Sequence, residues 1–193
     1  MIIHLIRHGK TLANEKKLYC GQTDLPLSEQ GTASLLELKR QGIYPKNIDM
    51  FFTSGLRRAE ETLELLYGEI HREILSELAE FRFGDFEMKS YEDLKDQADY
   101  QAWITDETGL IACPGGDSKV LFTRRVLAGF DMLTKWGEKS ETVLAVCHGG
   151  VIVTIMDFLF PSSRNFYEWQ PEPGCGYSIT YDSTQPNQYK AIM

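Results

Sequence analysis

The stretch Ile2-Ile3-His4-Leu5-Ile6-Arg7-His8-Gly9 sets the fold class, because a short apolar run ends abruptly in a charged pair and a glycine. Such a run is typical of a buried strand that opens into a loop. The pattern returns at residues 142–150, where Thr-Val-Leu-Ala-Val precedes Cys-His-Gly-Gly. A third apolar run covers residues 48–53 and ends at Ser54-Gly55. We therefore predict three buried strands, each followed by a polar turn.

Helical segments separate these strands. Capping residues and glycine stops mark their ends, as at Ser28 and Gly42. The predicted helices begin after Ser28, at about Leu56, after Ser118 and after Gly150. A closing hairpin is predicted at residues 179–181 and 188–192. Because strands alternate with helices, we predict an α/β fold, a three-layer α/β/α sandwich with a mostly parallel central sheet.

The length of 193 residues suits one domain. Between Ser76 and Pro114 the pattern loosens and becomes rich in aromatic and acidic residues, with one helix predicted to start at Ser90. We therefore predict a single domain over residues 1–193 with a cap-like insertion at about 81–114 that covers one end of the sheet.

Composition excludes several classes of partner. With 20 Lys+Arg against 28 Asp+Glu the net charge is −8, which disfavours nucleic acid and anionic membranes. No apolar run approaches the roughly 20 residues that span a bilayer, and the N-terminus is interpreted as a strand rather than a signal peptide. Four cysteines without a CxxC pair predict reduced thiols and a cytoplasmic location. Whether the chain is a monomer or a dimer stays open.

Histidines and arginines gather at the carboxyl ends of the predicted strands, where open α/β sheets bind ligands. Arg7 and His8 follow the first strand, Arg57 and Arg58 follow the second, and His148 follows the third. Arginine forks match phosphate oxygens, and a neutral imidazole is a competent nucleophile. A nearby carboxyl group would protonate the leaving oxygen. This set predicts phosphoryl-transfer chemistry on a small phosphate ester.

Several motifs resemble those of the histidine phosphatase, or phosphoglycerate mutase-like, superfamily. They occur in the family's order and cover nearly the whole chain. They are Leu5-Ile6-Arg7-His8-Gly9-Lys10-Thr11, Asn14, Gly21 with Asp24, Ser54-x-Leu56-x-Arg58-Ala59-x-x-Thr62, Leu78-x-Glu80-x-x-Phe83-Gly84, Pro114-Gly115-Gly116-Asp117-Ser118 and His148-Gly149-Gly150. The resemblance implies a phosphoglycerate mutase-like fold and a phosphohistidine intermediate.

Carried over by position, the resemblance implies a role for each of these residues. His8 would be the nucleophile and Glu80 the general acid, with Glu77 and Glu87 as competing acids. Arg58 rather than Arg57 would bind phosphate, because it directly precedes Ala59. The complete set of implied phosphoryl- and substrate-binding residues is Arg7, Asn14, Gln22, Thr23, Arg58, His148 and Gly149. No metal and no cofactor are implied.

The segment 84–106 and the stretch 21–28 are similar to the α-ribazole phosphatase branch of cobalamin synthesis. This implies a phosphomonoesterase of the histidine acid phosphatase type that acts on α-ribazole 5′-phosphate. The acidic character of the region after Glu80 and the short C-terminal end favour hydrolysis over mutase activity. Met88 replaces a usual glycine and Asp117 a usual glutamate. A broad-specificity or sugar-phosphate phosphatase, a phosphoglycerate mutase and a non-catalytic phosphate-binding module remain alternatives.

Four features have simpler structural interpretations. His4 is expected to pack on a strand rather than bind a metal, and His71 is expected at the surface before a strand. Cys147 is interpreted as a buried structural thiol rather than a nucleophile paired with His148. The aromatic residues between Phe81 and Trp103 form either ordinary core or a pocket lining.

Overall fold

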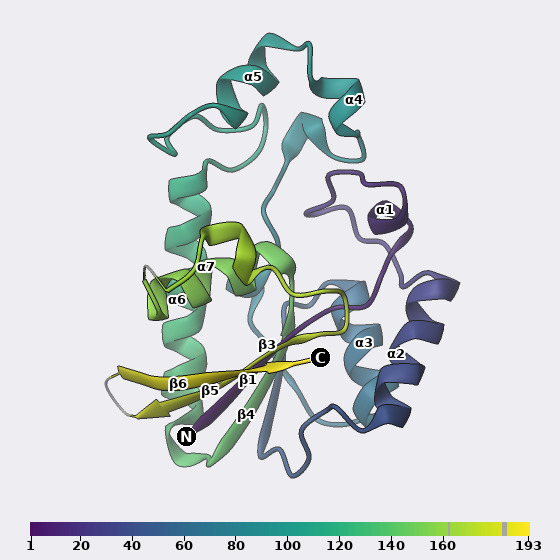
Figure 1. Ribbon diagram of the computed structural model, residues 1–193, viewed down its shortest axis with the longest axis vertical. Coiled ribbons are helices and arrows are strands. Elements are labelled where there is room, and N and C mark those ends of the chain that lie inside the picture. The colour runs from purple at the N-terminus through teal and green to yellow at the C-terminus, as the bar shows by residue number, and fades with distance from the viewer. Residues whose placement is uncertain (162, 183–184) are drawn as a thin grey trace.

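A twisted sheet of six strands organises the computed structural model, which describes residues 1–161, 163–182 and 185–193 (Figure 1). The spatial order is β3-β2-β4-β1-β5-β6. The first four of these are parallel, β5 runs antiparallel to β1, and β6 runs antiparallel to β5. The strands are β1 (Ile2–Arg7), β2 (Met50–Thr53), β3 (Glu73–Ile74), β4 (Thr142–Cys147), β5 (Gly176–Asp182) and β6 (Gln185–Ile192). The predicted α/β fold class is confirmed.

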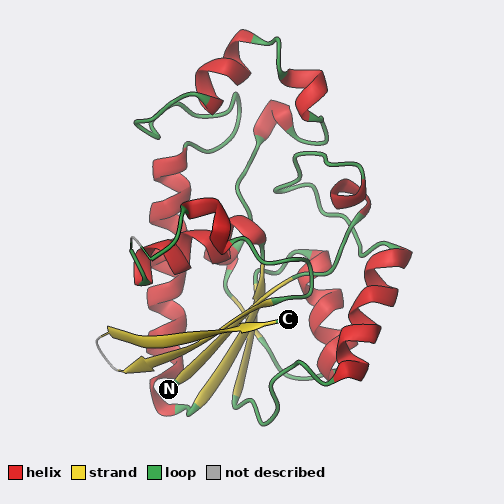
Figure 2. Cartoon of the chain, in the orientation of Figure 1, coloured by secondary structure: helices red, strands yellow, loops and turns green. Residues whose placement is uncertain are grey.

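Two helical layers cover the sheet (Figures 1 and 2). They are formed by α2 (Glu29–Gln41) with α3 (Arg57–Tyr67), and by α6 (Lys119–Trp136) with α7 (Gly149–Leu159). Successive residues of β4 face opposite layers. Val143 and Ala145 belong to the core cluster that includes α6 and α7, whereas Leu144 and Val146 belong to the cluster of α2 and α3. Because both faces are covered, the central strands are mostly apolar.

Local sequence signals account for the helix ends. Ser28 Oγ accepts a hydrogen bond from the Gly31 amide at 3.0 Å, and Ser118 Oγ accepts one from Leu121 at 3.2 Å. Gly42 ends α2 with φ at 74°, a left-handed conformation that glycine adopts without steric cost. The predicted helices at these positions are therefore confirmed.

Some predicted boundaries were wrong. The second strand begins at Met50 rather than at residue 48, and the C-terminal hairpin extends over β5 and β6. Residues 183–184, between the two strands, lie outside the described residues. The helix predicted after Ser90 is only α4 (Tyr91–Leu94), after which α5 (Ala98–Ile104) follows.

Several short elements were not predicted. The loop after His8 contains α1 (Leu12–Glu15), which Thr11 and Asn14 close in a reciprocal capping box. Single 3₁₀ turns are η1 (Ser76–Leu78), η2 (Gly84–Phe86), η3 (Gly137–Lys139) and η4 (Phe166–Trp169). Elements of three or four residues are too short to show hydrophobic periodicity, which explains why the sequence pattern missed them.

The segment 81–114 lies beyond the carboxyl ends of the parallel strands and carries α4 and α5 (Figure 1). Its large aromatic side chains Phe86, Tyr100 and Trp103 are buried and pack against one another, so most of its aromatic content is core. Met88 has φ at 59°, which explains why a glycine is the usual residue there. In the described part of the chain, no helix is long and apolar enough to cross a membrane.

Candidate active site

His8 is the central residue of the site and follows β1 directly. Its ring is buried, and Nδ1 lies 2.6 Å from the Gly9 carbonyl oxygen. A carbonyl only accepts hydrogen bonds, so Nδ1 carries the proton and Nε2 has the free lone pair. Burial, followed by the nearby Arg58 cation, holds the pKa of His8 well below its usual range. His8 is therefore a neutral imidazole with an unprotonated Nε2.

Arg58 meets that lone pair from the first turn of α3. Its Nε donates to His8 Nε2 at 3.3 Å, and its two terminal nitrogens donate to the carbonyl oxygens of Gly21 and Thr23 at 2.6 and 3.1 Å. Only 1% of the side chain is exposed, and no carboxylate of the described residues forms an ion pair with it. A buried cation held by neutral acceptors keeps its charge available for an anion. Arg57 instead points to solvent and pairs with Glu61.

His148 faces His8 from the carboxyl end of β4, with 5.1 Å between the ring centroids. It is fully buried, and Nε2 lies 2.8 Å from Ser54 Oγ at the end of β2. Burial is the first cause and Arg58 the second of a pKa well below the usual range. His148 is also the N-cap of α7, so the positive end of that helix points into the same space.

Arg7 is the second arginine of the site. Its Nη1 donates to the Pro171 carbonyl oxygen at 2.8 Å, and burial lowers the pKa of the guanidinium. A Cβ on Gly149 would lie only 3.3 Å from Arg7 Cζ, so a residue without a side chain allows the arginine to cross the start of α7. Arg7 Nε and His148 Nδ1 are both buried without a hydrogen-bond partner. Buried polar atoms are normally hydrogen-bonded, so these two nitrogens remain available to a ligand.

Glu80 is the acid that borders this space. One oxygen accepts from the Phe81 amide at 2.8 Å, and the other accepts from the Gly150 amide at 3.0 Å in the first turn of α7. Glu77 lies away from it, with its backbone against α6 at Gly129. Glu87 accepts hydrogen bonds from the loop that follows Cys20 and is fully engaged there. Of the three candidate acids, the fold brings only Glu80 to the start of α7 beside His148.

The other predicted binding residues have structural tasks of their own. Asn14 Oδ1 accepts from the Thr11 amide, which leaves only its Nδ2 to donate to a ligand. Gln22 Nε2 donates to the Glu80 carbonyl oxygen at 2.8 Å. The Thr23 hydroxyl donates to Glu87, so Thr23 contributes its carbonyl oxygen to Arg58 rather than a hydroxyl to the site.

The sequence did not assign roles to three residues that shape the site. Ser54 orients His148 through its hydroxyl. The Thr62 hydroxyl accepts a hydrogen bond from the Gly9 amide at 3.0 Å, which fixes the residue whose carbonyl oxygen contacts His8. Arg125 of α6 donates to the carbonyl oxygens of Glu77, Ala79 and Glu80 and pairs with Asp117 at 3.1 Å. Ser54 and Thr62 stand in a motif that was recognised, but Arg125 has no local sequence signal.

The simpler interpretations hold for the remaining residues. His4 packs against Ser178, with 2.8 Å between Nδ1 and Oγ, and burial lowers its pKa to about 4. Cys147 is fully buried, and burial raises the pKa of its thiol, which makes it a poor nucleophile. The described residues contain no group of three or more His, Cys, Asp or Glu side chains that could hold a metal ion.

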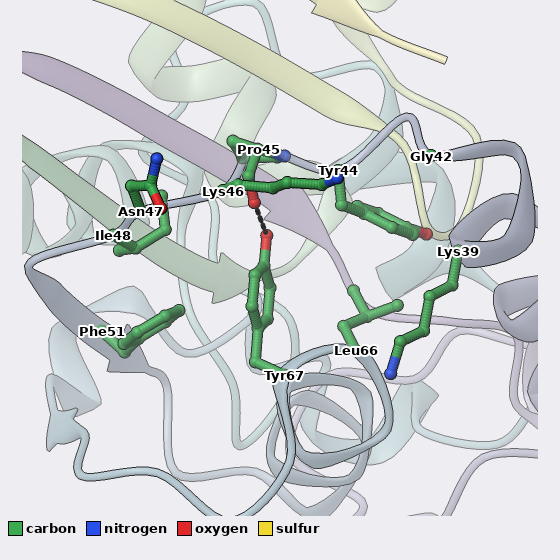
Figure 3. A pocket seen from close by; sticks show the side chains of 10 residues that line it. All are labelled: Lys39, Gly42, Tyr44, Pro45, Lys46, Asn47, Ile48, Phe51, Leu66 and Tyr67. Carbon is green, nitrogen blue, oxygen red and sulfur yellow. Dashed lines mark hydrogen bonds between the residues drawn. The ribbon is translucent and has the colours of Figure 1, made fainter.

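A separate hollow of about 350 Å³ lies at the far end of α3 (Figure 3). Tyr67 and Phe51 line it, and the Tyr67 hydroxyl donates to the Pro45 carbonyl oxygen. Arg58 lies in the first turn of the same helix, nine residues before Tyr67, which is about 13 Å along the helix axis. This hollow is therefore distinct from the site around His8.

Comparisons with known proteins agree with this geometry. The family model of the histidine phosphatase superfamily (branch 1) matches residues 3–190. The chain belongs to this superfamily. It is 33% identical to the adenosylcobalamin/alpha-ribazole phosphatase of Salmonella typhimurium over 187 residues, 93% of this chain and 90% of that protein. It is 30% identical to a 2,3-bisphosphoglycerate-dependent phosphoglycerate mutase of Xanthobacter autotrophicus, over 95% of this chain and 94% of the mutase.

The solved structure of the alpha-ribazole phosphatase from Shigella flexneri has the same fold, with a TM-score of 0.84 and 28% sequence identity. The match covers 96% of this chain and 93% of that one. This match confirms the phosphoglycerate mutase-like fold that the sequence motifs imply.

The electrostatics of His8 can be tested by an NMR titration of the imidazole nitrogens. We expect His8 to be neutral at pH 6 with its proton on Nδ1, because burial and Arg58 both disfavour the cation. Replacing Arg58→Met removes the second cause and should raise the His8 pKa toward its ordinary value of about 6.5.

His4 is the internal control, because burial alone lowers its pKa and the substitution should leave it at about 4. A doubly protonated His8 at pH 6 in the unmodified protein would contradict the assignment.

Proposed function

We propose that this chain is a phosphomonoesterase that uses His8 as its nucleophile. The observation that carries the proposal is a neutral imidazole whose Nε2 lone pair faces buried cations. In the first step Nε2 forms a bond to phosphorus while the bond from phosphorus to the leaving oxygen breaks. Glu80 gives its proton to that oxygen. In the second step Glu80 takes a proton from water, whose oxygen attacks the phosphohistidine and releases inorganic phosphate.

The surrounding residues stabilise the phosphoryl charge. Arg7 Nε and His148 Nδ1, both without partners, are the donors available to equatorial oxygens. Arg58 Nε, which donates to His8 Nε2 in the free protein, turns to an oxygen when Nε2 bonds to phosphorus. Asn14 Nδ2, the Gly149 amide and Gln22 are proposed as further ligands. These side chains and amides can stabilise the negative charge that develops on the phosphoryl oxygens, so we propose that no metal ion takes part.

The proposed substrate is α-ribazole 5′-phosphate. Support comes from the names of the relatives in Salmonella and Shigella and from their match over nearly the whole chain. Tyr19 and Phe83 pack together with ring centroids 5.0 Å apart, and both keep exposed surface. The Phe83 amide donates a hydrogen bond to Glu87, which places this residue beside the loop at residues 21–23. We propose that the two rings stack on the benzimidazole base of the substrate.

We further propose that segment 81–114 is a cap on this site and that the protein works in the cytoplasm. Gln22 joins the carbonyl of Glu80 to the loop that holds Arg58, so the start of the segment is part of the site wall. The four cysteines are all free thiols, which suits a reducing compartment.

A rapid-quench experiment with ³²P-labelled ester should trap an acid-labile phosphoenzyme. His8→Ala should abolish it, because no other described histidine in the site has a free Nε2. His71→Ala is the control, since 89% of that side chain is exposed, and it should trap label normally. Undiminished label in His8→Ala would refute the nucleophile assignment.

Glu80→Gln should slow phosphoenzyme formation in proportion to the basicity of the leaving group. We expect a loss of about 10²- to 10³-fold for alkyl phosphates but less than tenfold for p-nitrophenyl phosphate, which needs no proton. Glu77→Gln, on the neighbouring turn, is the matched control and should have little effect. Equal slowing for all esters would assign the proton to another group.

Steady-state phosphate release should distinguish the substrates. We expect kcat/KM for α-ribazole 5′-phosphate to exceed that for glucose 6-phosphate at least about tenfold, with no loss after chelation of divalent ions. Efficient conversion of 3-phosphoglycerate to 2-phosphoglycerate would favour a mutase instead. Activity that chelation abolishes would refute metal independence.

A further inference from the structure

Glu87 is a carboxylate bonded almost entirely to backbone amides. Its oxygens accept from the amides of Gly21, Gln22 and Thr23 at 3.0 to 3.3 Å. They also accept from the Thr23 hydroxyl at 2.8 Å and from the Phe83 amide at 3.1 Å. No salt bridge to a described cation competes for it. Glu87 therefore gathers one short loop, residues 21–23, around a single negative charge.

The opposite side of the same loop holds Arg58. The carbonyl oxygens of Gly21 and Thr23 accept from the two terminal nitrogens of the guanidinium. In both residues the amide thus faces Glu87 and the carbonyl faces Arg58. Arg58 donates hydrogen bonds to this stretch of backbone and Glu87 accepts hydrogen bonds from it. Hydrogen bonds linked in this way through peptide groups polarise one another.

The loop also fits closely at this point. A Cβ on Gly21 would lie 1.6 Å from the Phe81 carbonyl oxygen and 2.9 Å from Glu87 Oε1. A glycine is therefore required for the loop to pass this close to the backbone of Phe81. At this position it is the lack of space for a side chain, and not an unusual backbone conformation, that requires glycine.

Charge provides the second argument. Arg58 is 1% exposed and contacts only neutral acceptors, and burying such a cation costs free energy unless it is compensated. Glu87 is the carboxylate on the far side of the peptide groups that Arg58 contacts. Its negative charge therefore compensates the positive charge of the guanidinium from the other side of these peptide groups. It makes no direct contact, so the face that Arg58 turns toward His8 stays cationic.

We propose that Glu87 is a positioning residue that sets Arg58, through the loop 21–23, against the nucleophilic nitrogen of His8. The proposal rests on the proposed function of His8 and Arg58. It assigns to Glu87 neither proton transfer nor substrate contact. Its effect on catalysis passes through Arg58 and disappears when Arg58 is absent.

A double-mutant cycle tests this dependence. Glu87→Gln keeps the size of the side chain but turns an amide NH₂ toward backbone donors, so the loop can no longer hold Arg58 in place. We expect kcat/KM for p-nitrophenyl phosphate to fall about 100-fold and the vanadate inhibition constant to rise. In an Arg58→Met background the same substitution should cost less than about threefold.

Matched variants separate this effect from a general loss of structure. Glu92→Gln alters an exposed glutamate of α4 that pairs with Lys95, and it should change kcat/KM less than about twofold. Glu87→Asp keeps the charge and should recover part of the activity. Thr23→Val, which removes one donor to Glu87, replaces Glu87→Gln in the cycle if that variant does not fold.

The outcomes are distinct. A 100-fold loss in the Arg58→Met background as well would mean that Glu87 acts independently of Arg58, and would overturn the proposal. If His8→Ala retained full activity, the proposed function itself would fail. An inactive His8→Ala together with additive Glu87 and Arg58 effects would refute the positioning role alone.

Discussion

The buried contact between Arg58 and His8 is the interaction on which the site depends. Burial and, second, the neighbouring guanidinium lower the pKa of the imidazole and keep it neutral, and the Gly9 carbonyl keeps its proton on the far nitrogen. A cation in this position needs acceptors that do not cancel its charge, since a carboxylate in contact would reduce its attraction for phosphate. Backbone carbonyls meet that requirement. The loop 21–23 must therefore fold against α3, although it has no regular secondary structure.

The sheet supplies the other constraint, because it brings distant residues together at one edge. β1 and β4 are parallel neighbours in register, with Arg7 opposite Cys147, so His8 and His148 leave the sheet side by side. β2 joins the other side of β4 and delivers Ser54 and the start of α3. The two layers of helices bury these strands fully, which removes water from around both imidazoles and lowers their pKa values.

The proposed general acid is positioned by a different part of the molecule. Glu80 lies at the junction between the sheet and segment 81–114, where the amide of Gly150 holds its carboxylate. Arg125 on α6 fixes the backbone of that junction through three carbonyl oxygens, and Asp117 in turn orients Arg125. Asp117, one of the two departures from the usual family residues, thus still provides a carboxylate that pairs with this arginine.

The sequence by itself predicted the order of the central strands and long helices along the chain and most residues of the candidate site. Apolar runs, capping serines and the paired His-Gly turns are local signals, and parallel strands place their carboxyl ends together whatever lies between them. The family motif favoured Glu80 over Glu77 and Glu87, but only the tertiary structure shows which of the three borders the candidate site, because they differ in the backbone amides that face them. The tertiary structure also decided the roles of Arg125 and of the carbonyls of Gly21 and Thr23, since backbone hydrogen bonds over long sequence separations leave no pattern in side-chain identity.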